Sequence, residues 1–407
     1  MYTIREFYGE EGLAYRQLMC MMFRWQNAQL NKPEEFKKQL VEEDENQEDG
    51  FFRMGAFSED KLYAGLECSG HTIYFDGQQC KMCGVGGVVS DPNGPFKGAI
   101  KQIYVKAFEK MRQNGQIFSH LYPFAENYYR QFGYDVSAEY AFWNVPVERM
   151  SFPQYGKNIY FDGSDKMKAD IEKVYAQFSA NQNLAVVKNR TQWRLFYNNR
   201  VPYQNRSSFV HYNDENVPDG YMDFIAIKKD GTQDLEVKTL WYTTMEGLKG
   251  CLSLFEKQKQ YCNRVIIKLP KELDVSAFID STGGWGRKDK DAVHSLTNNG
   301  TSRVVDVEEV LKLAKIDGTG QVCIEIVGDH YASWNNGCYT IEFGKERKIT
   351  KGGKPDIQMD INAFSSAILG RYAFDNLELL ENVRILSNCE NLKKLFYRKP
   401  IWLEDTF

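Results

Sequence analysis

The sequence predicts an α/β protein with mixed sheets, and three observations lead to this class. Residues 84–134 read as strand, glycine-containing turn, helix and strand, because Ile100, Ile103 and Tyr104 and later apolar residues recur at helical spacing after a β-branched run. A similar order of hairpin, helix and strand returns at 221–269. The chain has 407 residues, which exceeds the usual size of a single core, so two or three domains are expected.

The first predicted region runs from 1 to 150. Its expected elements, in order, are an amphipathic helix near 10–26, strands at 53–57, 61–69 and 85–89, a helix at about 98–114, and strands at 116–124 and 138–145. The turn Ser58-Glu59-Asp60 joins the first two strands into a hairpin, since its residues favour tight turns.

The junction before the helix at 98–114 has the features of an anion site. Strand Val85–Val89 runs into the break Asp91-Pro92-Asn93-Gly94-Pro95, and the helix follows directly. The first turn of a helix has unpaired N–H groups and the positive end of the helix dipole. This junction therefore predicts a binding site for a pyrophosphate group.

The second predicted region, 151–290, repeats the order of the first. Its expected elements are strands at 221–227 and 235–241, a helix at 244–261 and a strand at 264–269. Between the second strand and the helix stand Tyr242, Thr243 and Thr244, with no glycine loop. We therefore expect a structural copy that shapes a cleft without binding a cofactor.

The segment 280–300 is polar and rich in glycine, and it is expected to be a long loop or an inserted lid. Beyond it, residues 301–407 alternate strand and helix patterns and form the third predicted region, 291–407.

Composition excludes several classes of protein. A net charge of -4 gives no electrostatic reason to expect nucleic acid or an anionic membrane as partner. The N-terminus lacks the pattern of a signal peptide and no apolar run is long enough for a membrane span, so a cytoplasmic location is expected. The nine cysteines are expected to be reduced, mostly buried thiols. Cys80 and Cys83 lack a second pair or a nearby histidine, so no metal site is expected.

Several motifs resemble the GNAT superfamily of N-acetyltransferases, and their order resembles its Eis-like (enhanced intracellular survival) branch. The motifs are Leu121-Tyr122-Pro123-Phe124, Tyr129-Arg130-Gln131-Phe132-Gly133-Tyr134, Arg303 to Glu308, Trp334-Asn335-Asn336-Gly337, Leu369-Gly370, and the closing stretch from Leu395 to Phe407. The resemblance implies tandem GNAT-like domains at 1–150 and 151–290, followed by a sterol-carrier-protein-like domain at 291–407. Whether that last domain holds a lipid or is a scaffold stays open.

The resemblance also implies residue roles. Tyr129 takes the place of the catalytic tyrosine, whose phenol stays protonated at neutral pH and can donate to a thiolate; the adjacent Tyr128 is its rival. The chain ends on the matching Phe407, whose terminal carboxylate would attract the amine and accept its proton. Acetyl-CoA would pair with the backbone of Val88 and Val89, with its pyrophosphate near Lys97, Gly98 and Ala99.

The sequence departs from the family pattern at the pyrophosphate loop. Pro95 stands in place of an arginine or glutamine, Phe96 in place of an arginine, and Ile100 in place of a small residue. Pro95 lacks a backbone donor, so Lys97 is the remaining cation of the motif. The five histidines show no triad spacing; His120 is the one expected near the cleft, with a hydrogen-bonded structural role.

The leading hypothesis is an acetyl-CoA-dependent N-acetyltransferase acting on a primary amine of a small cationic molecule or on an exposed lysine. No residue is assigned to the amine pocket; around Phe23-Arg24-Trp25-Gln26 an aromatic wall is expected rather than an acidic one. The alternative is a degenerate GNAT-fold protein that holds a small apolar or acyl ligand without catalysis, which Pro95, Phe96 and Ile100 would favour. The resemblance further implies a ring-shaped homo-oligomer such as a hexamer, which leaves a purely structural subunit as a third possibility.

Overall fold

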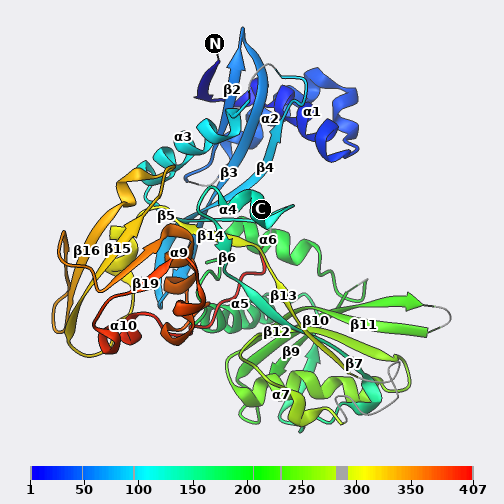
Figure 1. Ribbon diagram of the computed structural model, residues 1–407. Coiled ribbons are helices and arrows are strands. Elements are labelled where there is room, and N and C mark those ends of the chain that lie inside the picture. The colour runs from blue at the N-terminus through cyan, green and yellow to red at the C-terminus, as the bar shows by residue number, and fades with distance from the viewer. Residues whose placement is uncertain are drawn as a thin grey trace, which may run out of the picture. The chain divides into compact units, whose positions relative to one another are not determined.

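The computed structural model describes residues 2–47, 49–94, 97–204, 206–229, 232–280 and 292–405. By compactness the chain divides into two units. Unit 1 comprises Met1–Ala138, Gly300–Lys399 and Glu404–Phe407, and unit 2 comprises Glu139–Asn299 and Pro400–Leu403. Both combine helices with mixed sheets, which confirms the predicted α/β class (Figure 1).

The N-terminal sheet of unit 1 has the strand order β1-β2-β3-β4-β5-β14-β6. Its strands are β1 (Thr3–Glu6), β2 (Phe52–Ser58), β3 (Lys61–Phe75), β4 (Gln78–Ser90), β5 (Gln116–Leu121), β6 (Asp135–Val136) and β14 (Thr301–Val304). The helices are α1 (Gly12–Phe23), α2 (Pro33–Glu45), α3 (Ala99–Gln113) and α4 (Glu126–Arg130). The helix expected at 98–114 is present as α3, and the hairpin as β2 and β3. Helix α2 escaped prediction because its buried apolar residues are limited to Phe36 and Leu40.

Strand β14 joins this sheet from far along the chain. It pairs antiparallel with β5, where Thr301 lies opposite Leu121, and with β6, where Thr301 lies opposite Val136. Figure 1 shows β14, in yellow, beside the cyan β5. The N-terminal sheet is therefore completed by residues that follow the long segment Glu139–Asn299 of unit 2 in sequence.

The C-terminal part of unit 1 has its own sheet in the order β17-β16-β15-β18-β19. Its elements are α8 (Val307–Leu313), β15 (Gly320–Val327), β16 (Gly337–Phe343), β17 (Lys348–Lys351), β18 (Ile357–Asp360), α9 (Ile361–Leu369), β19 (Val383–Ile385) and α10 (Cys389–Leu395). Helix α9 is buried along its length and contacts both β14 and β18, so it ties this sheet to the N-terminal one.

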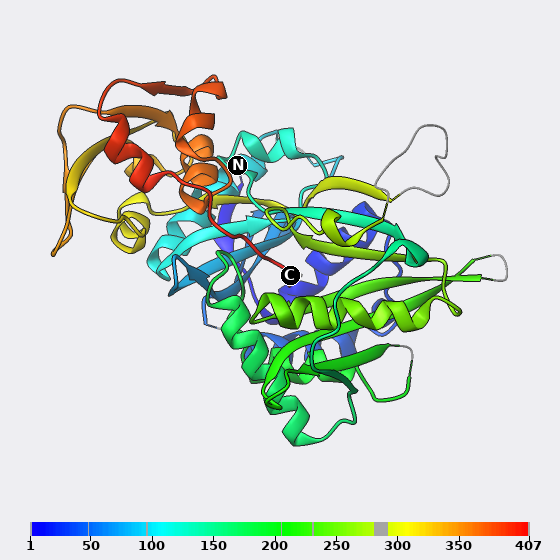
Figure 2. The same ribbon diagram turned by 90° about the horizontal axis from the view of Figure 1, so that it is seen from below.

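Unit 2 is built on a sheet in the order β13-β7-β12-β11-β10-β9-β8. Its strands are β7 (Glu139–Pro146), β8 (Lys157–Tyr160), β9 (Ser207–Tyr212), β10 (Pro218–Lys229), β11 (Thr232–Tyr242), β12 (Arg264–Pro270) and β13 (Val293–Asn298). The helices are α5 (Asp165–Ser179), α6 (Arg190–Asn198) and α7 (Met245–Ser253). One core lies around α7 and the other around α5, so helices cover both faces of this sheet (Figure 2).

Two expectations for unit 2 need correction. Part of the segment expected as a loop or lid is a strand, because β13 pairs with β7 and sets His294 opposite Trp143; its exposed polar residues gave no strand pattern. The remainder, 281–291, lies outside the described residues. The helix expected at 244–261 is α7 followed by a 3-10 helix, Leu254–Gln258. The three-part division at 150 and 290 stays a prediction.

Within the described ranges, no helix is both long and apolar enough to cross a membrane. All nine cysteines lie in those ranges as free thiols; Cys68, Cys83, Cys251, Cys262 and Cys323 are buried, while Cys389 is exposed. This agrees with the expectation of reduced, mostly buried cysteines.

Candidate functional site

Strands β4 and β5 diverge where the cofactor was expected. Their parallel pairing begins with Lys81 opposite Gln116 and, within the described ranges, ends with Gly84 opposite His120. Strand β4 continues to Ser90, and its other edge stays paired with β3, where Val89 lies opposite Gly65. The stretch 85–90 of β4 therefore has an edge that β5 does not pair, and an extended ligand could pair with its backbone.

A bulge in β4 shapes this edge. The register with β3 shifts between Gly65 and Glu67. Gly87 has a φ of 57°, a backbone conformation that glycine adopts easily and residues with a side chain rarely do. The carbonyl of Gly87 accepts a hydrogen bond of 2.8 Å from the Tyr15 hydroxyl. A Cβ at Gly87 would lie 2.0 Å from that hydroxyl oxygen, so α1 locks the bulge and leaves no room for a side chain. The side chain of Val89 is buried and that of Val88 is half-buried.

The start of α3 is exposed where the pyrophosphate was expected. Lys97 and Gly98 are exposed, and Gly98 precedes the helix with a φ of 83°. Among the described residues, no side chain caps this end of α3. Ala99 and Ile100 are buried in the core, so Ile100 does not point into the loop. Pro95, like Phe96, lies outside the described residues.

Tyr129 and Tyr128 lie in α4, in the same core cluster as Ala99 and Ile100, with Val88 packed against it. Tyr129 is buried, with 4% of its surface exposed, whereas Tyr128 is half-buried. Burial, with a smaller effect of Tyr128, raises the pKa of the Tyr129 phenol well above its usual value. Tyr129 is therefore protonated at neutral pH, as a general acid must be.

A buried arginine that the sequence analysis did not assign supports the turn after α4. Arg303 of β14 donates a 2.5 Å hydrogen bond to the carbonyl of Phe132 and a 2.6 Å one to Asp329. Gly133, with a φ of 86°, has no space for a Cβ, which would lie 2.7 Å from the guanidinium. The motif at Arg303 was recognised, but the side chain's partner in the tyrosine turn becomes evident only once β14 enters this sheet.

Asp405, the last residue that the structure describes, contacts Tyr122 just after β5. The Tyr122 hydroxyl donates a 2.5 Å hydrogen bond to the backbone carbonyl of Asp405. Burial, together with the charges of Asp405 and Glu404, raises the pKa of the Tyr122 phenol. Phe407 lies outside the described residues. Tyr122 belongs to a motif that marked the resemblance, yet the contact with the tail gave no signal in the sequence.

The C-terminal stretch just before the end is anchored within unit 2. Asn183 donates a 2.8 Å backbone hydrogen bond to Pro400 and accepts one of 3.0 Å from Trp402. The backbone N–H of Leu403 donates to the Tyr140 hydroxyl at 3.1 Å, and its carbonyl accepts from the Asn299 amide at 2.6 Å. These hydrogen bonds hold the segment in place, and Ile401, Trp402 and Leu403 are buried.

His120 occupies the position on β5 at which the pairing with β4 ends. It is fully buried, and its Nδ1 lies 2.7 Å from the hydroxyl of Ser302, which lies 2.7 Å from the hydroxyl of Ser137. Burial, with a smaller effect of His71, lowers the pKa of His120 to about 3. The imidazole is neutral at physiological pH, in keeping with the predicted hydrogen-bonded structural role.

The expected aromatic wall forms a surface cluster after α1. Phe23 and Trp25 stack with ring centroids 4.8 Å apart, and both are exposed, Trp25 to 58%. In the described part of the chain, no group of three or more histidine, cysteine, aspartate or glutamate side chains could hold a metal ion.

Comparison with known families agrees with this geometry. Residues 3–137 match the acetyltransferase (GNAT) domain, and residues 307–404 match the sterol carrier protein domain. The molecule therefore has an N-terminal GNAT domain, a further sheet in unit 2, and a sterol-carrier-like domain at its C-terminus, which confirms the predicted fold. No curated protein sequence matches the chain.

Solved structures resemble the whole chain in fold. A probable N-acyltransferase from Enterococcus faecalis has a TM-score of 0.80 at 20% identity, and a GCN5-related N-acetyltransferase from Anabaena variabilis has 0.79 at 17%. Eis1 from Mycobacterium abscessus has 0.78 at 17%. In each case 100% of both chains is covered. These likenesses show a shared fold, while the match of residues 3–137 to the acetyltransferase (GNAT) domain supports acyl transfer as the general activity.

Proposed function

We propose that this protein is an acetyl-CoA-dependent N-acetyltransferase that acts on a primary amine of a small cationic molecule or on a lysine. The observation that carries the proposal is the edge of β4 at 85–90, which β5 leaves unpaired and which leads to the uncapped start of α3. An extended pantetheine arm can pair with that edge while its pyrophosphate meets helix N–H groups.

In this proposal the backbone groups of Val88 and Val89 hold the pantetheine arm, and Lys97, Gly98 and Ala99 hold the pyrophosphate. Acetyl-CoA supplies an activated acyl thioester. The amine nitrogen forms a bond to the acyl carbon as the carbon–sulfur bond breaks. Tyr129 gives its phenolic proton to the departing thiolate; burial keeps this phenol protonated at neutral pH, and it belongs to the core cluster that also contains Ala99.

The proposed base is the terminal carboxylate of Phe407, which would orient the ammonium group of the substrate and accept its proton. The hydrogen bond between Tyr122 and Asp405 supports this role, because it holds the chain two residues before the end against β5. Residues appended after Phe407 should then abolish turnover while the melting temperature and acetyl-CoA affinity persist. An unchanged rate would remove the carboxylate from the mechanism.

Calorimetric titration of the full chain with acetyl-CoA, followed by measurement of thiol release with polyamines and lysine peptides, tests the proposal. We expect saturable binding and amine-dependent thiol release. Absence of binding at millimolar acetyl-CoA would favour the alternative, a GNAT-fold binding protein, for which Pro95 and Phe96 remain the sequence evidence. Binding without transfer to any amine would contradict the transferase and leave a cofactor-binding protein.

Assembly into a ring-shaped homo-oligomer, such as a hexamer, is part of the same proposal and rests on the resemblance of the sequence. A cytoplasmic location stays the expectation of the sequence analysis. Light scattering of the purified protein tests the assembly, and a monomer would contradict it.

A further inference from the structure

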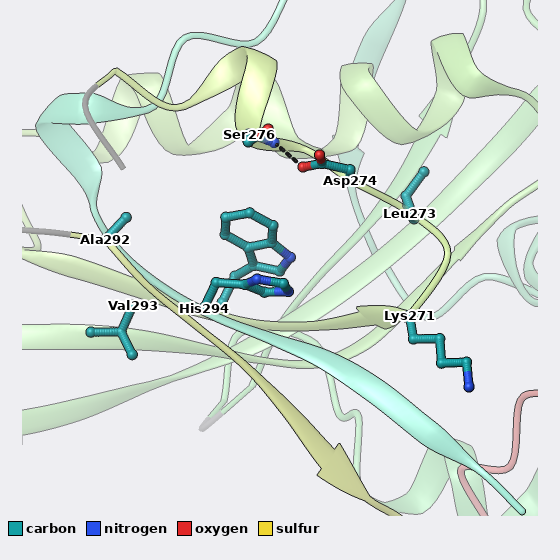
Figure 3. Close-up of a pocket in the computed structure, with 8 residues that line it drawn as sticks. Lys271, Leu273, Asp274, Ser276, Ala292, Val293 and His294 are labelled. Atoms are coloured by element: carbon teal, nitrogen blue, oxygen red, sulfur yellow. Dashed lines mark hydrogen bonds between the residues drawn. The ribbon is translucent and has the colours of Figure 1, made fainter. Parts of the chain in front are cut away.

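Unit 2 contains a cavity of its own, of about 700 Å³. It lies between the edge strand β13, the neighbouring strand β7 and the segment that follows β12. Figure 3 shows Leu273 and Asp274 on that segment, across the cavity from His294 on β13. A cavity of this size can accommodate a small organic molecule.

One wall of the cavity is aromatic. Trp143 of β7 and His294 of β13 lie opposite each other in the sheet, and their rings stack with centroids 4.2 Å apart and planes at 22°. Leu273 and Ala292 add apolar surface. Because flat aromatic walls favour flat ligands, this lining selects for a planar ring system.

The indole N–H of Trp143 is a buried hydrogen-bond donor. Trp143 is 3% exposed, and its indole Nε1–H has no hydrogen-bond partner among the residues that the structure describes. A buried N–H without an acceptor costs about 1–3 kcal/mol, so such groups are usually satisfied by water or a ligand. The N–H itself is enclosed by protein atoms, and Trp143 lines the cavity, so a small shift of the indole ring would bring the N–H to an acceptor of a bound ligand.

The charges of the described lining residues indicate the sign of the ligand. Lys271 lies 2.6 Å from Glu139, and both side chains are largely buried, so this positive charge is already matched. Asp274 is exposed; its carboxylate accepts the backbone N–H of Ser276 at 2.8 Å. Hydrogen bonds from Ser276, and more weakly the nearby His294, lower the pKa of Asp274, so it is ionised at neutral pH. Asp274 is thus the carboxylate available to a cation.

We propose that this cavity of unit 2 binds a planar aromatic amine. The ring of the amine lies against Trp143 and His294, and its hydrogen-bond acceptor receives the indole N–H. Its ammonium group faces Asp274. The site belongs wholly to unit 2 and is separate from the residues proposed for acyl transfer. It therefore gives unit 2 a ligand-binding role that does not depend on the activity of the N-terminal domain.

The test uses 5-methoxytryptamine, which combines an indole ring, an ether acceptor and an ammonium group, with 5-methoxyindole-3-acetate as a matched anion. Both are titrated calorimetrically into the full chain without acetyl-CoA. We expect saturable binding of the amine and at least about tenfold weaker binding of the acid. Absence of binding at millimolar amine, or equal binding of the two compounds, would overturn the proposal.

Two variants locate the binding. Trp143→Phe keeps an aromatic ring but removes the N–H, and Asp274→Asn keeps the acceptor for Ser276 but removes the charge; each should weaken the amine by about fivefold or more. Asp274 is exposed, so its variant tests the site even if Trp143→Phe destabilises the core. Unchanged affinity in Asp274→Asn would place the amine elsewhere and refute the assignment.

Discussion

The two strand-to-helix junctions of this molecule, β4 to α3 in unit 1 and β11 to α7 in unit 2, begin alike and end differently. In both, the strand pairs in parallel with its neighbour over a short stretch, Lys81–Gly84 with β5 and Leu235–Glu236 with β12. In unit 1 the residues 91–98 then lead to a helix start without a side-chain cap. In unit 2, Thr243 and Thr244 lead directly into α7.

The two junctions differ in whether protein atoms fill the space at the helix N-terminus. The Thr244 hydroxyl accepts the backbone N–H of Gly247 at 2.9 Å and lies 3.1 Å from Asp219. A Cβ at Gly247 would lie 2.4 Å from the backbone oxygen of Asp219, so protein atoms fill this place. At Gly98, which precedes α3, no atom of the described residues lies within 4 Å of the Cβ position. A strand-to-helix junction can therefore leave the helix end open for a phosphate, as before α3, or fill it with a single hydroxyl, as before α7.

The largest expected effect is a loss of kcat on substitution of Tyr129 in unit 1, compared with substitution of Tyr242 in unit 2. Tyr129→Phe should lower kcat by about 100-fold or more and leave acetyl-CoA affinity nearly unchanged, because it removes the proton donor and keeps the ring. Tyr242→Phe, at the end of β11, is the control and should leave kcat unchanged. Steady-state kinetics and calorimetry measure both. A large kcat loss in Tyr128→Phe instead would reassign the acid to that residue.

A second effect tests the open helix end. Lys97→Ala should weaken acetyl-CoA binding by about tenfold or more, since it removes a charged hydrogen bond to the pyrophosphate. Lys106→Ala, at an exposed position of α3 that pairs with Glu109, is the matched control and should bind as the wild type does. Equal weakening in both variants would mean that the general charge of α3, and not a site at its start, attracts the cofactor.

A third effect contrasts one buried histidine from each unit. The folded pKa of His120, about 3, lies below the unfolded value of about 6.5, so its contribution is present above pH 6.5 and is lost as the pH falls, by at most about 1.4 kcal/mol per pH unit. Burial lowers the pKa of His211, but hydrogen bonds to Asp219 and Tyr155 outweigh it and leave the pKa raised. Its contribution is therefore present below pH 6.5 and is lost as the pH rises through the folded pKa.

Denaturation of the wild type, His120→Asn and His211→Gln across pH 4.5–8 measures these contributions by difference. The His120 variant should lose least at acidic pH relative to the wild type, and the His211 variant should lose most there. The same pH profile for both variants would contradict the opposite signs.

The smallest expected effect tests the sealed helix end. Thr244→Ala should lower the free energy of unfolding by about 1 kcal/mol, the usual cost of removing an N-cap, and should leave acetyl-CoA affinity unchanged. Chemical denaturation and calorimetry provide the two readings. A gain or loss of acetyl-CoA affinity would show that the junction in unit 2 takes part in cofactor binding after all.

Local sequence patterns predicted the elements that carry strong periodicity. Helix α3 and strand β2 were placed within a residue or two, because both patterns bury one face against a core. Strand β3 begins at Lys61 as expected but runs to Phe75, beyond the predicted end at 69. Strand β13 was missed, since its residues are exposed and its pairing with β7 depends on a partner distant in sequence. The sequence analysis named Val88, Lys97, Gly98 and Tyr129 as residues of the candidate site. Their functional roles stay predictions.

By itself, the sequence determined the class of fold, the break between β4 and α3, and the short junction before α7, since these depend on neighbours within a few positions. The tertiary structure alone decided that β14 completes the N-terminal sheet, that Arg303 supports the turn after Tyr129, and that Tyr122 holds Asp405. Each of these contacts joins residues far apart in the chain. Such contacts form only when packing brings their partners together, so no local pattern records them.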